Sequence, residues 1–328
     1  MYNMKICFLD KTIFQYNEDD KYSSKLRGAE TILINLSIHL KNLGNEVTIY
    51  NNCPANSGKN WYNIELSSND KTIYDVAIAN ADANLFNTIK AKKKIVISYS
   101  LQSIEKFIRK KQLLPYLKHR PTFFLIGKYH KNNRSKLTSL FGSKLLNLSV
   151  DDIFLQTQLN EKIIPYQAIF TSRADRNLDL LIDIWKSKIF PKFKKAKLLV
   201  TPHKNVDENF NIANREFNSQ QTMIADLLKS RIFLVPGHKA ELFCLAAEEA
   251  KELCLPIVTL GIGSLSERVI HGKTGFIAKN TNEFAEFTLE LFNNDNLWQK
   301  LRNNLIDLRG KNNWLNSAKD LLNKINQI

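Results

Sequence analysis

Apolar residues in the first half of the chain occur in two alternating patterns, short continuous runs and helical spacing. The run Met4–Leu9 is almost wholly apolar, which is typical of a buried strand. After a polar segment, apolar residues recur at three- and four-residue spacing up to Gly44 and predict an amphipathic helix: Ile32, Leu33, Leu36, Leu40 and Leu43. Three further runs predict strands: 46–50, 74–79 and 94–98. Strands that alternate with helices at these lengths predict a parallel sheet with right-handed crossovers.

The second half of the chain repeats this alternation. Apolar runs predict four more strands: 168–171, 197–201, 231–236 and 256–260. Helices are expected between these strands and over most of 282–328. We therefore predict an α/β protein with two Rossmann-like, doubly wound domains at 1–158 and 159–310, followed by a C-terminal helix at 311–328. Ligands of such sheets bind at the carboxyl ends of the strands, so we expect the two domains to face each other across a ligand-binding cleft.

Composition and cysteine usage agree with a two-domain protein from a reducing compartment. The 328 residues are about twice the usual length of one domain. The four cysteines are scattered without C-x-x-C spacing, which argues against a zinc site or a disulfide framework. No two of the six histidines have metal-ligand spacing, so no metal is expected. The N-terminal residues lack a signal-peptide pattern and no apolar run is long enough to span a membrane, so we expect a cytoplasmic protein.

The net charge of +15 is concentrated in one part of the chain. Between Lys90 and Lys144 there are fifteen Lys or Arg residues and a single acid, Glu105. This stretch is either a solvated surface or a patch that contacts an anionic membrane. Apolar residues among the charges suit membrane contact: Leu113, Leu114, Tyr116, Leu117, Phe123 and Phe124. No recognisable nucleic-acid module is present, so nucleic acid is not an expected partner.

Two glutamates bracket the start of a predicted helix over 242–253. Glu241 precedes this helix, and Glu249 follows eight residues later, about two turns further. The N–H groups of Phe243, Cys244 and Leu245 would be unpaired donors in the first turn, which suits an anion such as a diphosphate. Glu249 would accept hydrogen bonds from ribose hydroxyls. In the alternative interpretation, Glu241 only stabilises the helix dipole and Glu249 is a surface acid.

Four motifs in the same order resemble those of bacterial family 4 glycosyltransferases, which are retaining enzymes with the GT-B architecture of two Rossmann-like domains. The segment from Glu241 to Ala250, written E-L-F-C-L-A-A-E-E-A, resembles the paired-glutamate motif of that family. The three other motifs are similar to its glycine loop, its phosphate loop and its G-x-x-x-E-x-V and G-x-x-G segments: Arg27-Gly28-Ala29-Glu30, Arg173-Ala-Asp175-Arg176-Asn177, and Gly263 to Ile277.

The resemblance implies a role for each of these motifs. It makes Glu241 and Arg176 the catalytic residues: Arg176 would pair with the donor diphosphate, and Glu241 would orient the transferred sugar. Arg173 is a second candidate for the diphosphate, and Glu249 would hold the ribose. The loop at Gly28 would face the donor phosphate and the acceptor. In the GT-B architecture the C-terminal helix 311–328 is expected to pack back on the first domain.

The implied reaction is transfer of a hexose from a UDP- or GDP-linked donor to a glycan or lipid-linked acceptor, with retention of configuration. No metal or other cofactor is implied. The basic stretch 90–144 belongs to the first domain, which in this fold usually binds the acceptor. An acidic glycan or a lipid-linked diphosphate sugar would fit it, with peripheral contact at the inner face of the cytoplasmic membrane. We therefore expect a role in the synthesis of a bacterial surface polysaccharide.

The chain also departs from the family pattern. Arg27 stands where a first glycine is usual, and no histidine occurs in 98–102, where many members contact the transferred sugar. Ser100 or Gln102 would then supply this contact, and His238, three residues before Glu241, is a further candidate.

Alternatives remain open at this point. A GT-B-type epimerase or hydrolase would use the same diphosphate contacts, and a non-catalytic binding protein would explain the missing histidine. A nicotinamide dehydrogenase is disfavoured, because no G-x-G-x-x-G follows the first strand.

Overall fold

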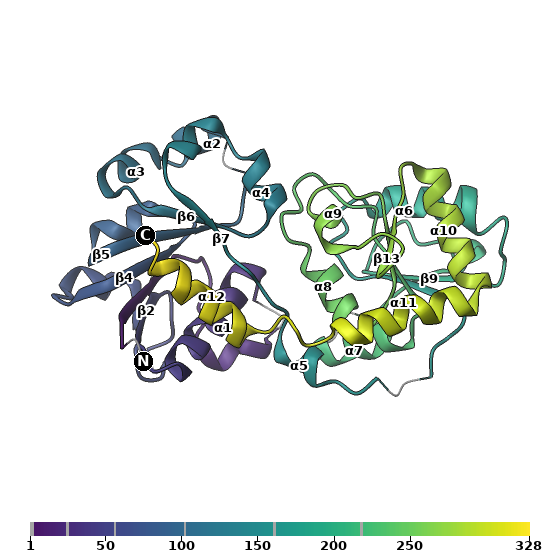
Figure 1. The fold of residues 1–328 in the computed structure, drawn as a ribbon, viewed down its shortest axis with the longest axis horizontal. Helices are drawn as coiled ribbons and strands as arrows, with labels where there is room; N and C mark the ends of the chain where they lie inside the picture. The colour runs from purple at the N-terminus through teal and green to yellow at the C-terminus, as the bar shows by residue number, and fades with distance from the viewer. Residues whose placement is uncertain (1–2, 24–25, 56, 102, 160–161, 217–218) are drawn as a thin grey trace. The chain divides into compact units, whose positions relative to one another are not determined.

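The computed structural model describes residues 3–23, 26–55, 57–101, 103–159, 162–216 and 219–328. The chain divides into two compact units. Unit 1 contains Met1–Ser149 together with Trp314–Ile328, and unit 2 contains Val150–Asn313. Among the described residues, each unit has its own parallel sheet, seven-stranded in unit 1 and six-stranded in unit 2. Figure 1 shows the two units with their separate sheets.

The sheet of unit 1 has the strand order β3-β2-β1-β4-β5-β6-β7, and all its pairs are parallel. Its strands are β1 (Lys5–Leu9), β2 (Glu46–Asn51), β3 (Trp61–Asn63), β4 (Ile73–Asn80), β5 (Lys90–Ser98), β6 (Thr122–Leu125) and β7 (Ser143–Leu145). Ile6 pairs with Val47 on one side and with Val76 on the other, and all three side chains are buried. The central strands are therefore covered on both faces, which explains their continuous apolar runs.

Helices cover both faces of this sheet: α1 (Gly28–Asn42), α2 (Ile104–Arg109), α3 (Leu113–His119), α4 (Lys128–Asn133) and α12 (Trp314–Ile325). The 3-10 helix η3 (Ala83–Asn87) connects β4 to β5. Helix α12 packs beside α1, as seen in Figure 1, although α1 ends at Asn42 and α12 begins only at Trp314. The last helix of the chain is thus part of unit 1.

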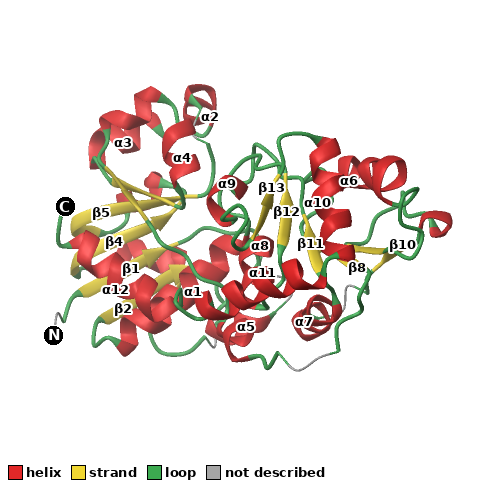
Figure 2. Cartoon of the chain, turned by 45° about the vertical axis from the view of Figure 1, so that its right-hand side comes forward, coloured by secondary structure: helices red, strands yellow, loops and turns green. Residues whose placement is uncertain are grey.

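The sheet of unit 2 has the strand order β10-β9-β8-β11-β12-β13, again with all pairs parallel. Its strands are β8 (Gln167–Phe170), β9 (Lys197–Val200), β10 (Ile212–Asn214), β11 (Ile232–Leu234), β12 (Ile257–Thr259) and β13 (Gly275–Ile277). Figure 2 labels all of them except β9. The described helices of this unit are α5 (Asp152–Gln156), α6 (Leu178–Ile184), α7 (Gln220–Lys229), α8 (Leu245–Glu252), α9 (Leu265–Arg268), α10 (Thr281–Asn293) and α11 (Asp295–Leu308). The strand order reverses direction between β8 and β11, which is where doubly wound sheets bind their ligands.

Three aromatic residues predicted to suit membrane contact lie in the core instead. Tyr116, Phe123 and Phe124 are buried, and the rings of Tyr116 and Phe123 stack at a centroid distance of 4.8 Å. The prediction was wrong for Phe123 and Phe124 because T-F-F-L forms strand β6, with β5 and β7 on either side. It was wrong for Tyr116 because this side chain of α3 packs into the same core as Phe123. Leu114 and Leu117 of α3 are exposed, as that interpretation requires. Among the described residues, no helix is long and apolar enough to cross a membrane.

Candidate functional site

Two loops at the carboxyl edge of the unit 2 sheet are held together by very close backbone contact. One follows β11 and contains Gly237, and the other follows β12 and contains Gly263. Both glycines have positive φ, 98° and 73°. A Cβ at Gly263 would lie 2.3 Å from the carbonyl oxygen of His238, and one at Gly237 would lie 2.6 Å from that of Ile262. Only glycine fits this approach, so the two loops form a rigid frame.

Glu241 is positioned by that frame. Its backbone N–H donates to the His238 carbonyl at 2.9 Å, and its carbonyl accepts from the Ser264 N–H at 2.9 Å. The Nε of Arg176 lies 3.5 Å from a carboxylate oxygen of Glu241, and both side chains are mostly buried. Burial raises the pKa of Glu241, whereas Arg176 and the backbone N–H of Cys244 lower it. The structure therefore brings together the two residues that the resemblance makes catalytic.

The Arg173–Asn177 loop follows β8 and presents its arginines at the same edge. Arg176 also binds Asp175 at 2.9 Å, and Arg173 binds the same carboxylate at 2.8 Å from an exposed position. Asn177 has a left-handed backbone with φ of 65°, and its side-chain amide donates to the Gly237 carbonyl. This asparagine therefore adopts a backbone conformation typical of glycine and also ties the Arg173–Asn177 loop to the Gly237 loop.

Helix α8 begins at Leu245, three residues later than predicted, and Cys244 is its N-cap with φ of 57°. The N–H of Cys244 faces the Glu241 carboxylate, so this donor is occupied in the present structure. Phe243 is buried under the guanidinium of Arg268, which lies 4.5 Å from the ring centroid. Arg268 in turn binds Glu248 at 3.3 Å, so it braces the first turn of α8.

Glu249 lies on the second turn of α8 and is buried. The pKa of Glu249 is raised to about 7, chiefly by burial and also by the nearby carboxylate of Asp151, while Arg215 opposes the rise. Keeping this buried carboxyl charged costs free energy unless a ligand donates hydrogen bonds to it. This environment is unlike that of a surface acid, which was the alternative interpretation. His238 is half-buried next to Glu241, and its Nδ1 accepts from the Ala240 N–H.

The candidate residues of unit 1 lie at the carboxyl edge of its own sheet. Arg27 is the N-cap of α1, and its N–H donates to the Glu30 carboxylate at 3.1 Å. Gly28 opens the helix, and a Cβ there would meet no atom within 4 Å. The carbonyl of Ser100 accepts from Nε2 of His130 at 3.1 Å. Gln102 lies outside the described residues.

Unit 1 also contains a buried polar cluster that was not predicted from the sequence. Tyr16 donates to the Asp10 carboxylate at 2.5 Å, and Tyr99 donates to the Asn80 amide oxygen at 2.7 Å. Burial raises the pKa of Asp10 to about 6, and the charge of Glu30 adds to this rise. The signal in the sequence was the position of Asp10, directly after β1, where polar residues face the ligand edge of a parallel sheet.

Comparisons with known proteins identify what this arrangement is similar to. Residues 203–307 match the family described as glycosyl transferases group 1. Over 214 residues the chain is 25% identical to an uncharacterized glycosyltransferase of Methanocaldococcus jannaschii. That alignment spans 57% of this chain and 58% of the relative, so the chain matches less than two thirds of the relative's length.

Solved structures establish the fold. TarM of S. aureus has a TM-score of 0.73 at 11% identity, with 99% of both chains covered. Anabaena HepE in complex with UDP has a TM-score of 0.69 at 14% identity and covers 99% of this chain and 100% of its own. Sucrose-phosphate synthase of Thermosynechococcus elongatus has a TM-score of 0.65 at 13% identity, with 98% of both chains covered. The two parallel α/β units therefore have the GT-B fold.

Proposed function

We propose that this chain, whose residues 203–307 match the glycosyl transferases group 1 family, is a retaining glycosyltransferase that uses a nucleoside-diphosphate sugar. The observation that carries the proposal is the Arg176–Glu241 pair in front of α8, in loops that the glycines at 237 and 263 hold rigid. UDP is the nucleotide we favour, because the named structures of HepE and TarM contain it.

In the proposed reaction, the bond between the anomeric carbon of the sugar and the diphosphate breaks, and negative charge develops on the leaving phosphate. Arg176 and Arg173 would neutralise this charge together with N–H groups at the start of α8. The proposed donors there are the N–H groups of Phe243, Leu245 and Cys244, and the last of these must first leave the Glu241 carboxylate. To bind the diphosphate, Arg176 releases the Glu241 carboxylate and pairs with a phosphate instead. Glu241 is then free to bind sugar hydroxyls.

Glu249 is proposed to accept hydrogen bonds from the ribose, which would satisfy its buried carboxylate. The resemblance to retaining family 4 enzymes implies that the leaving phosphate accepts the proton of the acceptor hydroxyl. Under this proposal the positive charge on the diphosphate comes from arginines and helix N–H groups, and no metal ion is needed. His238, beside Glu241, and Ser100 in unit 1 are proposed contacts of the sugar or the acceptor.

The acceptor is proposed to be a glycan or a lipid-linked sugar in the synthesis of a bacterial surface polysaccharide. This part of the proposal rests on the family resemblance and on the basic stretch 90–144. It places the protein in the cytoplasm, in peripheral contact with the anionic inner leaflet of the membrane.

Calorimetry and thermal-shift measurements with UDP, GDP and ADP test the donor site. A ligand of the native state raises the melting temperature by mass action. Arg176→Ala should weaken binding of the preferred diphosphate about 10- to 100-fold, the effect of losing one charge-assisted hydrogen bond. Arg109→Ala, which removes an exposed arginine of unit 1, is the matched control and should bind as the wild type does.

Two results would contradict this assignment. Failure of the wild-type protein to bind any nucleoside diphosphate would exclude the donor site as described. Equal loss of affinity in both arginine variants would show that Arg176 acts only through net charge. Turnover of the matching nucleotide-sugar without an acceptor would instead favour an epimerase or hydrolase.

A further inference from the structure

The basic stretch 90–144 is divided in the structure into two groups of side chains. One group is engaged within unit 1. On β5, Lys92 binds Asp75 at 2.7 Å, Lys93 donates to the Ile325 carbonyl at 2.8 Å, and Lys94 contacts His119 at 3.0 Å. Lys144 of β7 donates to Gln327. These lysines hold the end of the chain and the sheet edge, so they are poorly placed to bind a large external partner.

The second group lies on α2 and α3, which expose apolar side chains. Ile108 is 60% exposed, Leu114 77% and Leu117 56%. The opposite faces of the same helices carry Phe107 and Tyr116, both buried, whose ring centroids are 4.6 Å apart. The two helices are thus fixed to the core by their aromatic residues, and large aliphatic side chains are left in solvent.

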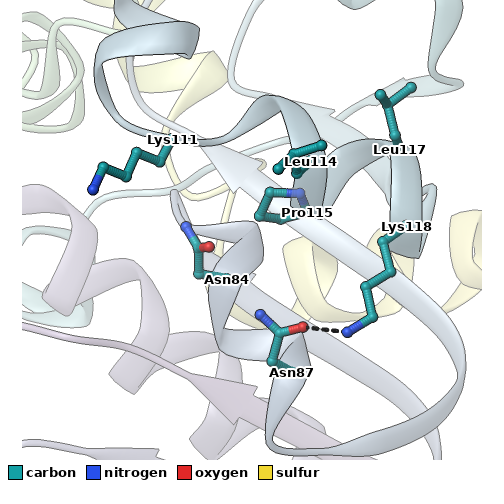
Figure 3. A pocket seen from close by; sticks show the side chains of 7 residues that line it. All are labelled: Asn84, Asn87, Lys111, Leu114, Pro115, Leu117 and Lys118. Carbon is teal, nitrogen blue, oxygen red and sulfur yellow. Dashed lines mark hydrogen bonds between the residues drawn. The ribbon is translucent and has the colours of Figure 1, made fainter.

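Cationic side chains surround these exposed residues. Arg109, Lys110, Lys111 and Lys118 are all exposed, and Glu105 is the only acid in the sequence between 90 and 144. A surface groove of about 530 Å³ lies between α3 and η3. Figure 3 shows side chains that line it, among them Lys111, Leu114, Leu117 and Lys118. Lys118 reaches Asn87 at 2.8 Å across the groove. Positive and aliphatic side chains therefore alternate over one surface.

This combination distinguishes a bilayer surface from other partners. A soluble polyanion would bind lysines and arginines but would gain nothing from exposed leucines. An apolar protein surface would have to remove water from a dense set of exposed cations, which costs free energy. A bilayer with acidic lipids suits both kinds of side chain. Its phosphates bind the cations, and the aliphatic side chains enter the boundary between headgroups and acyl chains.

We propose that the α2–α3 face, defined by Ile108, Arg109, Lys111, Leu114, Leu117 and Lys118, docks on a bilayer that contains anionic phospholipid. Lys111 and Lys118 bind lipid phosphates at the groove, and Ile108, Leu114 and Leu117 insert into the interface. The inference deepens the proposed function, because it names the surface through which a lipid-linked acceptor is approached. Vesicle binding needs no donor nucleotide, so its failure is distinguishable from failure of the donor site.

The test is co-sedimentation of the full chain with phosphatidylcholine vesicles, with and without phosphatidylglycerol. Phosphatidylglycerol is added at about 30 mol%, roughly the share of anionic lipid in an acidic leaflet. Binding should require phosphatidylglycerol and weaken with salt. Each cation near an acidic leaflet strengthens binding about fivefold, so Lys111→Ser/Lys118→Ser should weaken it more than tenfold. Leu114→Ser/Leu117→Ser should also weaken it at least tenfold. Both variants should keep the wild-type affinity for UDP.

Matched controls separate this face from net charge and from general exposure. Lys192→Ser/Lys195→Ser removes two exposed lysines of unit 2, and Ile13→Ser removes a fully exposed aliphatic residue of unit 1. Both should bind vesicles as the wild type does. The proposal is overturned if wild-type protein does not bind phosphatidylglycerol vesicles, or binds neutral vesicles equally well. It is also overturned if the leucine variant binds normally while the lysine variant does not, since that result indicates a soluble polyanion.

Discussion

At Glu249, ligand binding and protein stability make opposite demands on one buried carboxyl group. Burial raises its pKa to about 7 in the folded chain, from an ordinary value of 4.5. Between these two pH values the folded chain holds a proton that the unfolded chain has lost, so the free energy of unfolding falls as pH rises through this window. The loss is complete above pH 7 and amounts to roughly 3 kcal/mol.

Glu249→Gln should therefore raise the free energy of unfolding by about 2 to 3 kcal/mol at pH 8.5 and change it little at pH 4. The same variant should weaken UDP binding, because an uncharged amide is a poorer acceptor for ribose hydroxyls. Urea unfolding at both pH values and calorimetry measure the two effects. Glu286→Gln, on an exposed face of α10, is the control and should change neither quantity. A variant that is destabilised equally at both pH values would contradict this account.

Asn177 combines two roles that a single substitution separates. Its left-handed backbone favours glycine or asparagine, and its amide donates to the Gly237 carbonyl. Asn177→Ala loses the hydrogen bond and adds backbone strain, for a total of about 2 kcal/mol in the free energy of unfolding. Asn177→Gly loses only the hydrogen bond and should retain about 1 kcal/mol more stability than the alanine variant. Urea unfolding checks the order, and a glycine variant less stable than the alanine variant would refute it.

At the scale of elements, the strands of the two sheet centres were predictable and the edges were not. The runs at 4–9, 74–79 and 94–98 correspond to β1, β4 and β5, because strands buried on both faces are continuously apolar. Strands β3, β7, β10 and β13 have three residues each, and none of them is buried along its whole length. Strands β11 and β12 are equally short but wholly buried, and the apolar runs at 231–236 and 256–260 predicted them. Strand β6 lies within the basic stretch, so its aromatic residues suggested a surface.

The candidate site was predictable only as far as the motifs reached. The loops of Arg176 and Glu241 are 65 residues apart and meet because both follow neighbouring strands, β8 and β11, of a parallel sheet. The bracing of α8 by Arg268 and the burial of Glu249 beside Asp151 depend on packing that no local pattern encodes. The roles of these residues in binding and catalysis remain predictions.

The segments after β5 and β6 are joined by a buried histidine, which makes unit 1 sensitive to acid. His130 donates from Nε2 to the Ser100 carbonyl, and burial lowers its pKa to about 4, an effect to which Arg134 adds. Below pH 6.5 the unfolded chain binds a proton that the folded chain cannot, so the free energy of unfolding falls as pH drops from 6.5 to 4.

His130→Gln keeps a donor for Ser100 and removes this titration. Between pH 7 and pH 4, urea unfolding should show the free energy of unfolding falling in both proteins. The fall should be smaller in the variant than in the wild type, by up to about 3 kcal/mol. The pKa of His119 is also lowered to about 4, by burial and by Lys94, so His119→Gln is the comparison. His119 is partly exposed, and its replacement should have the smaller effect. Equal pH profiles for the wild type and His130→Gln would contradict the role of His130.

At the scale of the whole molecule, the chain leaves unit 1 at residue 149 and returns to it at 314. The boundary expected at 158–159 falls inside unit 2, because α5 (Asp152–Gln156) packs on α8 of that unit. The end of the chain belongs to unit 1, where α12 packs against α1 and Trp314 is buried at its first turn. Each unit therefore contains one buried tryptophan on a C-terminal helix: Trp314 on α12 and Trp298 on α11.

These two tryptophans allow the units to be destabilised one at a time. Trp314→Ala should cost about 3 to 5 kcal/mol of unit 1 stability, the usual effect of deleting a buried aromatic side chain. Hydrogen exchange should then speed up in β1, β4 and α1, while UDP still binds with wild-type affinity. Trp298→Ala also loses a hydrogen bond to the Arg231 carbonyl, and should speed exchange in β11 and α11 and weaken UDP binding. If Trp314→Ala destabilised unit 2 as strongly as unit 1, the two units would unfold as one, and the division of the chain at 149 and 314 would not be a division in stability.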